Sequence, residues 1–193
     1  MKRMEPLTRD ELLAMLDCAY QTSRQHHAMI LLCYSHGLRA HEVAGLRVAN
    51  VNVKDWRLHI RRGKRSKVTD QAILSHKDYL LDERKTLQEW LAMRPASLYL
   101  FPSVYHPSYN GPLTRVHVYR IVRRYAELAG LPDSKRSPHA LKHSLGQSLV
   151  DAGCDVALVQ AALGHKDIGS TAHYFRISDT KADVARKAAL CAE

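Results

Sequence analysis

The chain has 193 residues, of which 46% are hydrophobic and 25% are charged, a size and composition typical of one globular domain. No apolar run is long enough to cross a bilayer, and the charged start lacks the apolar stretch of a signal peptide. The formal net charge of +10 predicts a polyanionic partner, nucleic acid first, with a basic but uninvolved surface as the alternative. The four cysteines are scattered, which fits a reducing cytoplasm: Cys18, Cys33, Cys154 and Cys191.

The first part of the chain is predicted to form three helices. Thr8 and Glu11 have the spacing of a capping box, and apolar residues follow with helical spacing. A second, more apolar helix is predicted over residues 23–36 and ends at Gly37. A short helix should follow over residues 40–46.

Between residues 48 and 74 the hydrophobic pattern changes from helical to alternating. Residues 68–73 are β-prone, and four apolar residues alternate with polar ones: Val51, Val53, Leu58 and Ile60. This pattern predicts three short antiparallel strands, with turns near residues 54–55 and 62–66.

The rest of the chain is predicted to be helical apart from one loop. A helix over residues 77–93 ends before Pro95, and a loop over residues 96–112 contains the apolar run 98–101. Cap and stop residues bound the remaining predicted helices, which span residues 114–129, 138–153, 155–164, 170–175 and 181–192. The predicted fold class is therefore α+β, a mostly helical single domain with one small three-stranded sheet.

The stretch SPHALKHS, residues 137–144, gathers two histidines and a lysine where a helix begins. His139 and His143 share a helix face, which a zinc ion can use. A metallopeptidase helix would need Glu in place of Ala140, however, and no Cys or carboxylate lies at ligand spacing nearby. Anion binding explains more, because a helix N-terminus offers unpaired N–H groups, to which His139 and Lys142 add donors. A solvated basic turn is the alternative.

Two further segments have the same basic character. GLRAHE, residues 37–42, places Arg39 directly after a helix stop, where it binds an anion or pairs with Glu42 or Glu11. RRGKRSK, residues 61–67, is a hairpin tip with five cations in seven residues. Such a tip is either solvated or reaches along a phosphate backbone.

The last motif is LGH, residues 163–165, with Tyr174 nine residues after its histidine. By itself Tyr174 would be interpreted as an amphipathic core tyrosine.

In this order, GLRxxE, a basic hairpin with GK, SPHxLxH, LGH and a tyrosine nine residues on resemble the catalytic domain of tyrosine recombinases. The resemblance runs from about residue 7 to residue 177, and the order and spacing of the motifs make it specific. It implies that residues 1–193 form one catalytic domain without a separate N-terminal core-binding domain, as in the short fimbrial phase-variation recombinases. A catalytic fragment of a longer integrase would have the same features.

In that family, cationic side chains and a tyrosine surround the scissile DNA phosphate. The resemblance implies that Tyr174 is the nucleophile and that Lys64 is the general acid, with Lys67 as the alternative. It assigns the stabilisation of the phosphate to Arg39, His139, Lys142 and His165. Further DNA contacts are expected from Arg61, Arg62, Arg65, Lys67 and His143.

The chemistry explains why these residue types are needed. Tyr174 would attack the phosphate and form a 3′-phosphotyrosyl bond, which keeps the phosphodiester energy, so no ATP or other cofactor is required. Its hydroxyl has an ordinary pKa of about 10 and needs a proton acceptor at neutral pH. Lys64 would protonate the departing 5′ oxygen. The cations would stabilise charge on the non-bridging oxygens without a metal ion.

Lys142 departs from the family pattern, which has arginine at the fourth position of HxxR. Lysine keeps the charge but loses the rigid fork that holds two phosphate oxygens at once. Loss of one such preorganised donor typically costs about 3–4 kcal/mol, or roughly 100- to 1,000-fold in rate. The exchange is compatible with a slower recombinase, with compensation by a neighbouring residue, or with a protein that binds DNA without cleaving it.

These observations predict a site-specific DNA recombinase. The alternatives are a DNA-binding regulator with the same fold and, third, a type IB topoisomerase, which is usually a larger chain. The resemblance implies double-stranded DNA with paired recombination sites as partner, a homo-oligomer on that DNA, expected to be a tetramer, and no membrane. In the family a C-terminal helix, here residues 181–192, docks on a neighbouring protomer. The expected location is the bacterial cytoplasm, at the nucleoid.

Overall fold

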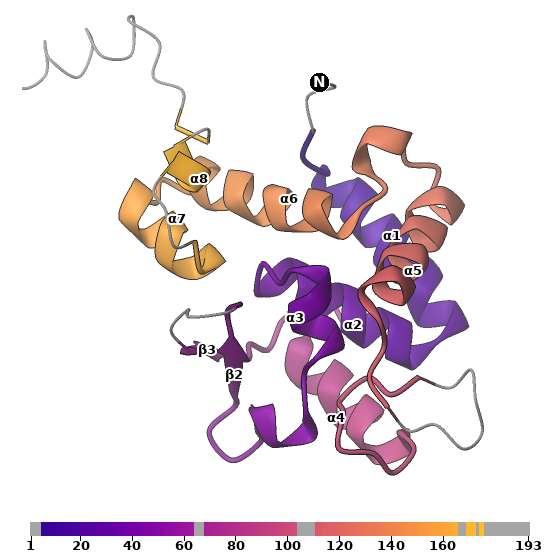
Figure 1. Ribbon diagram of the computed structural model, residues 1–193. Helices are drawn as coiled ribbons and strands as arrows, with labels where there is room; N and C mark the ends of the chain where they lie inside the picture. Colours follow the sequence, from indigo (N-terminus) through magenta and orange to yellow (C-terminus); the bar gives the residue numbers. More distant parts are fainter. Residues whose placement is uncertain (1–4, 64–67, 104–110, 166–168, 173, 176–193) are drawn as a thin grey trace, which may run out of the picture.

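The computed structural model describes residues 5–63, 68–103, 111–165, 169–172 and 174–175. The helices in these ranges are α1 (Arg9–Thr22), α2 (Arg24–Ser35), α3 (Ala40–Ala44), α4 (Glu83–Met93), α5 (Arg115–Leu128), α6 (Pro138–Asp151), α7 (Val156–Leu163) and α8 (Gly169–Ala172). The strands are β1 (Val51–Asn52), β2 (Arg57–Arg61) and β3 (Val68–Ala72), and two short 3-10 helices are η1 (Val48–Asn50) and η2 (Asp133–Lys135). The predicted fold class, mostly helical with one small antiparallel sheet, is confirmed (Figure 1). None of the described helices is both long and apolar enough to cross a membrane.

Most long helices begin where a short polar side chain caps them. At Thr8 the predicted capping box is present, because Thr8 Oγ1 accepts from the Glu11 N–H at 3.2 Å and Glu11 Oε2 accepts from the Thr8 N–H at 2.7 Å. Side-chain oxygens accept a backbone N–H in the same way at Ser23, Asp82, Thr114, Ser137 and Asp155. Each such bond satisfies one of the N–H groups that a helix start leaves without an intrahelical acceptor.

The predicted helix over residues 77–93 was wrong at its start, because α4 begins only at Glu83. Asp78 Oδ1 accepts from the Leu80 N–H at 3.0 Å, and His76 Nδ1 accepts from the Asp78 N–H at 2.9 Å. These local side-chain bonds give the backbone an alternative to the helix. Asp82 then caps α4 by accepting from the Lys85 N–H at 3.0 Å.

Near the end of the chain, the turn of helix predicted over residues 170–175 is α8, which begins at Gly169 and ends at Ala172. The helix predicted over residues 181–192 lies outside the described residues.

The sheet is a meander in the order β1-β2-β3, with both neighbouring pairs antiparallel. Leu58 and Ile60 on β2 are fully buried, and they lie opposite Gln71 and Thr69 on β3. Successive strand residues point to opposite faces, so one face of β2 joins the core while the other carries polar residues. The hairpin is therefore held firmly at its base, directly before residues 61–67.

Helix α2 is the centre of the core. Every residue from Ala28 to Cys33 is at most 1% exposed, and the helix packs against α1, α4 and α6 (Figure 1). Two of its polar side chains are buried with backbone partners: Gln25 Nε2 donates to Pro102 O at 2.8 Å, and His27 Nε2 lies 3.1 Å from Leu80 O. Because α2 is buried up to Cys33 and ends at Ser35, the turn that follows it begins next to the packed core.

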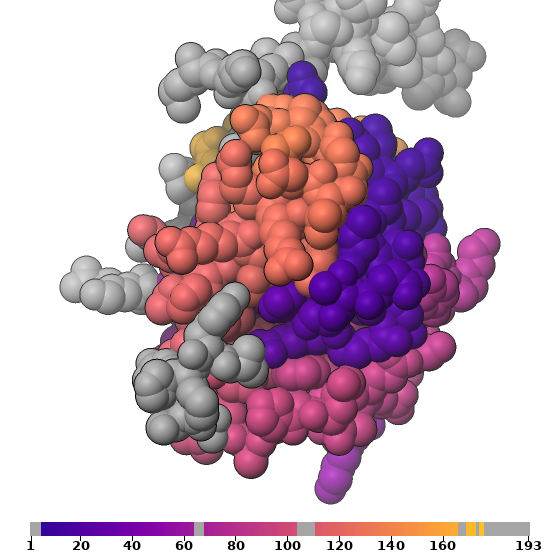
Figure 2. All heavy atoms as spheres, turned by 90° about the vertical axis from the view of Figure 1, so that its right-hand side faces the viewer, coloured from indigo at the N-terminus to yellow at the C-terminus, as the bar shows by residue number. Residues whose placement is uncertain are grey.

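The N-terminal segment lies against residues that are far away in the sequence. In Figure 2 the indigo surface of the first helices lies between the orange segment that includes α6 and the pink segment that includes α4. The Leu7 N–H donates to Ser144 Oγ on α6 at 2.7 Å. Glu11 on α1 accepts from Lys135 Nζ at 2.7 Å, so this carboxylate pairs with Lys135 rather than with Arg39. These contacts fix α6, which carries the SPHALKHS motif, on the helical core.

Two glycines allow the energetic cost of backbone strain to be separated from the cost of overpacking. Gly37 lies in the turn after α2, and Gly130 lies in the turn after α5. Gly37 (φ +55°) and Gly130 (φ +73°) both have the left-handed conformation, but a Cβ added at Gly37 would lie 2.8 Å from Leu163 Cδ2, while one at Gly130 would meet nothing within 4 Å. Gly130→Ala should lower the free energy of unfolding by about 1 kcal/mol, the lower end for a non-glycine residue at positive φ. Gly37→Ala should lower it by about 2–3 kcal/mol, because overpacking adds to the strain. Urea unfolding checks both values, and equal losses would mean that Leu163 moves aside freely.

Candidate active site

A pocket of about 570 Å³ opens where the N-terminal ends of α3, α5 and α6 meet. Three residues that the sequence assigned to catalysis, Arg39, His139 and Lys142, line it together. They come from two motifs about a hundred residues apart in the chain, so their meeting depends on the fold. The remaining lining residues are Leu38, Ala40, His41, Arg115, Val116, Tyr119, Ser137 and Pro138.

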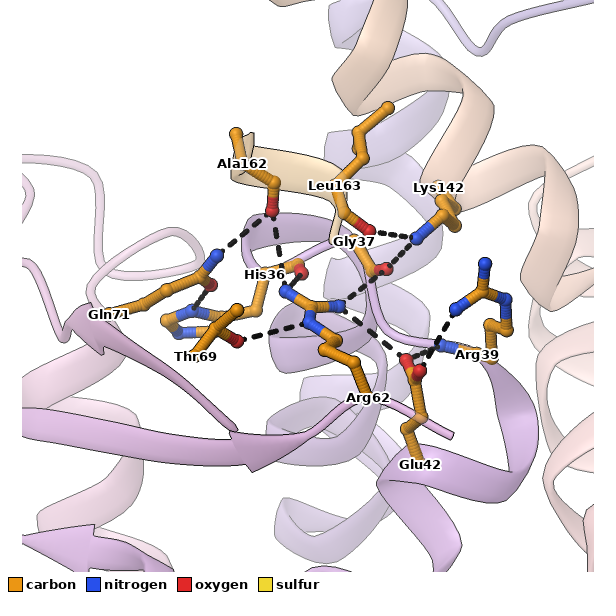
Figure 3. Close-up of polar contacts among 10 residues, drawn as sticks. All are labelled: His36, Gly37, Arg39, Glu42, Arg62, Thr69, Gln71, Lys142, Ala162 and Leu163. Carbon is orange, nitrogen blue, oxygen red and sulfur yellow. Dashed lines mark hydrogen bonds and ion pairs between the residues drawn. The ribbon is translucent and has the colours of Figure 1, made fainter. Parts of the chain in front are cut away.

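Arg39 is placed by the turn after α2 and by a buried carboxylate. The left-handed Gly37 ends α2, and Arg39 is the residue directly before α3. Glu42, whose side chain is fully buried, accepts from the Arg39 backbone N–H at 2.8 Å and from Arg39 Nη1 at 3.0 Å (Figure 3). The predicted pairing with Glu42 is thus present, yet the Arg39 side chain keeps 38% of its surface exposed and lines the pocket.

Lys142 is buried and donates to backbone carbonyls. Its residue surface is 2% exposed, and Nζ donates to Gly37 O at 2.7 Å and to Leu163 O at 2.5 Å (Figure 3). Burial, followed by the nearby charges of Arg39 and Arg62, lowers the Lys142 pKa to about 7. A lysine ammonium has three donors, and within the described residues these two oxygens are the acceptors of Nζ. The third N–H can therefore serve an anion in the pocket.

One face of α6 connects the pocket to Tyr174. His139, Lys142, His143 and Gly146 have the spacing of a single helix face. The Tyr174 ring stacks on His143 with 4.9 Å between ring centroids and an interplanar angle of 29°. The same ring lies over Gly146, where an added Cβ would be 2.5 Å from Tyr174 Cζ.

Tyr174 does not line the pocket in this structure. Its backbone N–H donates to Thr171 O at 3.0 Å, and its side chain is half-buried. Burial raises the Tyr174 pKa to about 12. His165, half-buried after the left-handed Gly164, has Nδ1 2.9 Å from Thr171 Oγ1, so Thr171 contacts both predicted catalytic residues.

Arg62 corrects one sequence expectation. The hairpin motif predicted that it contacts DNA, but it is 1% exposed and its guanidinium is held by acceptors inside the protein (Figure 3). Its direction follows from the alternation of β2, which turns Arg62 inward and leaves Arg61 exposed. Lys64, Arg65 and Lys67 lie outside the described residues.

Sequence reasoning missed several residues of the pocket. Arg115 and Tyr119, both exposed on α5, line it opposite the SPHALKHS motif, and His41 lines it from α3. The available signal was that Arg115 directly follows the helix cap Thr114, which makes it a cation at a helix start. Nothing in the linear sequence indicates that the starts of α5 and α6 meet.

The pocket is suited to an anion such as a phosphate. Cationic or ionisable side chains line it, and the α6 N-terminus, with Ser137 as cap, contributes the positive end of a helix dipole. Within the described part of the chain, no group of three or more His, Cys, Asp or Glu side chains is placed to hold a metal ion.

Comparisons with known proteins agree on one family. The model of the phage integrase family matches residues 5–181. The type 1 fimbriae regulatory protein FimB of Escherichia coli K12 is 31% identical over 176 residues, which cover 90% of this chain and 84% of FimB. The tyrosine recombinase XerC of Erythrobacter litoralis is 35% identical over 167 residues, covering 86% of this chain and 49% of XerC. In the solved structures, XerH recombinase bound to its difH substrate has a TM-score of 0.76 at 22% identity, covering 96% of this chain and 55% of XerH.

The position of Lys142 predicts an unusual titration. Its ammonium should lose its proton near pH 7, because burial and the charges of Arg39 and Arg62 oppose the charged form. NMR of the lysine side-chain carbons, with Lys142→Arg to assign the signal, measures the midpoint. A midpoint above pH 10 would mean that the two carbonyls hold the charged form against burial. Adding inorganic phosphate should move the midpoint upward, since an anion in the pocket favours the charged lysine.

Proposed function

The chain belongs to the phage integrase family and is a tyrosine site-specific recombinase, and we propose that it cleaves and rejoins double-stranded DNA through a phosphotyrosyl bond at Tyr174. The observation that carries this proposal is the pocket that brings Arg39, His139 and Lys142 together beside a helix start. The family match and the similarity to XerC favour the recombinase over the DNA-binding regulator.

In the proposed reaction, the scissile phosphate lies in the pocket. Tyr174 Oη attacks phosphorus and gives its proton to a neighbouring group or to a phosphate oxygen, the bond to the 5′ oxygen breaks, and a 3′-phosphotyrosyl ester forms. The departing 5′ oxygen takes a proton from Lys64, or from Lys67 as the alternative. Attack by a 5′ hydroxyl of the partner strand reverses these steps, releases Tyr174 and rejoins the DNA. No external energy source is needed, because the ester bond is exchanged rather than hydrolysed.

The cations stabilise the five-coordinate transition state in this proposal. Arg39 offers a guanidinium that Glu42 orients, and Lys142 offers the N–H that its two carbonyl acceptors leave over. His139 and His165 add donors for the non-bridging oxygens. Because burial raises the Tyr174 pKa to about 12, the hydroxyl holds its proton at neutral pH, and attack on phosphorus needs a proton acceptor.

The partners we propose follow from this reaction. They are paired DNA recombination sites, with contacts from Arg61, Arg65, Lys67 and His143, and further copies of this chain. Solved relatives include a lambda integrase dimer bound to a core site and XerH bound to difH, which supports DNA-bound multimers. We propose a tetramer that acts on chromosomal DNA in the bacterial cytoplasm.

Capture on genomic DNA tests the function without knowledge of the target site. The chain is incubated with DNA fragments from its own organism, the reaction is stopped with detergent, and DNA that resists denaturing washes is sequenced. Wild type should retain fragments that share one sequence, joined through a 3′ phosphate, whereas Tyr174→Phe should retain none. An absence of covalent DNA with wild type would contradict the proposed function, and capture by Tyr174→Phe would move the nucleophile elsewhere.

Gly146→Ala tests the position of Tyr174. The substitution is favourable for helix α6 by about 1 kcal/mol, but the new Cβ would lie 2.5 Å from Tyr174 Cζ and would displace the ring. Adduct formation on the captured fragment should fall at least about tenfold, because Tyr174 must reach the phosphate from this face of α6 and a displaced ring no longer starts there, while DNA affinity stays unchanged. The control is Gln147→Ala, which removes only a side-chain bond to Asp151. An adduct yield that is unchanged or raised contradicts this prediction.

A further inference from the structure

Arg62 is one of the largest fully buried side chains of the chain, although it directly follows strand β2 at the base of a basic hairpin. A buried guanidinium is costly unless its donors are satisfied. Here all three nitrogens have partners. The acceptors are Thr69 Oγ1 at 3.1 Å for Nε, Gly37 O at 3.2 Å and Glu42 Oε2 at 3.5 Å for Nη1, and His36 O at 2.9 Å and Ala162 O at 3.3 Å for Nη2 (Figure 3).

These acceptors belong to the segments that carry the pocket residues. Gly37 is in the turn that leads to Arg39, and Gly37 O also accepts from Lys142. Glu42 binds both Arg62 and Arg39 (Figure 3). Arg62 therefore shares one acceptor, Glu42, with Arg39 and another, Gly37 O, with Lys142.

The third segment is the end of α7. Ala162 O accepts from Arg62, and the next carbonyl, Leu163 O, accepts from Lys142. Gly164 packs directly on the Arg62 side chain, because an added Cβ there would lie 2.6 Å from Nε and 2.7 Å from Cδ. Arg62 thus supports the backbone immediately before His165.

Stability alone does not explain an arginine at this place. A buried ion pair can often be replaced by apolar residues without loss of stability. What the planar fork supplies is geometry, because one guanidinium donates in several fixed directions, which a lysine ammonium on a flexible stem does not. The charge of Arg62 also contributes, after burial and Arg39, to the lowered Lys142 pKa.

We propose that Arg62 is a positioning residue of the recombination reaction, which fixes Arg39, Lys142 and the backbone before His165 relative to one another without contacting DNA. This inference rests on the proposed function. In this proposal Arg62 positions other residues, whereas the exposed Arg61 beside it contacts DNA.

The test compares Arg62→Lys with Arg57→Lys, a matched change on the same strand. Among the described residues, Arg57 donates to the side chain and the carbonyl of Asp70, both within the hairpin. On the captured fragment, three quantities are measured: the single-turnover cleavage rate at saturating protein, the final yield of adduct, and DNA affinity at several salt concentrations. Thermal melting of each variant protein checks that it is folded. Arg62→Lys should cleave roughly 10- to 100-fold more slowly, with affinity, salt dependence and final yield of adduct as in wild type. Arg57→Lys should match wild type within about twofold in every measurement.

A second substrate separates positioning from a general loss of structure. A methylphosphonate at the scissile position lacks one charged oxygen, so the placing of the cations matters less there. The rate gap between wild type and Arg62→Lys should narrow on it. The proposal would be overturned if the rate ratio between wild type and Arg62→Lys were equal on both substrates. It would also be overturned if Arg62→Lys lowered only the final yield of adduct, or if it reduced the salt dependence of DNA affinity.

Thr69→Val covers the case in which Arg62→Lys does not fold. It removes the acceptor of Arg62 Nε and leaves the charge in place. It should slow cleavage in the same direction by a smaller factor, and a wild-type rate would overturn the inference. If wild type itself forms no adduct, the proposed function fails rather than the role of Arg62.

Discussion

The carbonyl oxygen of Gly37 accepts from two buried cations, Arg62 and Lys142, and the geometry of the pocket depends on this shared acceptor. Within the described residues, Arg39, Arg62 and Lys142 gather around a single carboxylate, that of Glu42. Charge in a low-dielectric interior is costly unless it is paired and hydrogen-bonded. Backbone carbonyls satisfy the donors but bring no negative charge, so the site keeps an excess of positive charge. In the proposed reaction a phosphate in the pocket supplies the missing anion, and the repulsion between the cations favours its binding.

This arrangement gives a physical meaning to lysine at position 142. A guanidinium would present a fork to the phosphate, whereas the ammonium of Lys142 uses two of its three donors on Gly37 O and Leu163 O. The residue therefore acts first as a clamp between the turn before Arg39 and the end of α7. Its charge is adjustable, because a pKa near 7 makes protonation depend on the anion next to it. If the proposed function holds, DNA binding at this pocket is coupled to proton uptake by Lys142.

Much of this architecture could be predicted from the sequence, because it depends on local signals. Thr8, Thr114 and Asp155 cap helices where short polar residues precede apolar periodicity, and Gly37 and Gly164 end them with positive φ. The burial of Arg62 was not predictable from the same kind of signal. Five cations in seven residues are typical of a solvated tip, and although the alternation of Leu58 and Ile60 continues to Arg62, the linear sequence does not show the distant acceptors that hold its guanidinium inside. Arg115 lines the pocket because the starts of α5 and α6 pack together, and no sequence pattern indicates that contact.

Helix α6 carries residues that line the cationic pocket and residues that hold the Tyr174 ring. His139 and Lys142 face the pocket, and His143 and Gly146, further along the same face, carry the Tyr174 ring. Lys142 and Gly146 are four residues apart, about 6 Å along the axis, a spacing that a helix anchored by Ser144 and the buried Leu141 holds fixed. Tyr174, the proposed nucleophile, is thus kept close to the cations but outside their pocket, with a pKa of about 12. In the proposed reaction, cleavage requires the phosphate to bring Tyr174 and the cations together, which ties bond breaking to bound DNA.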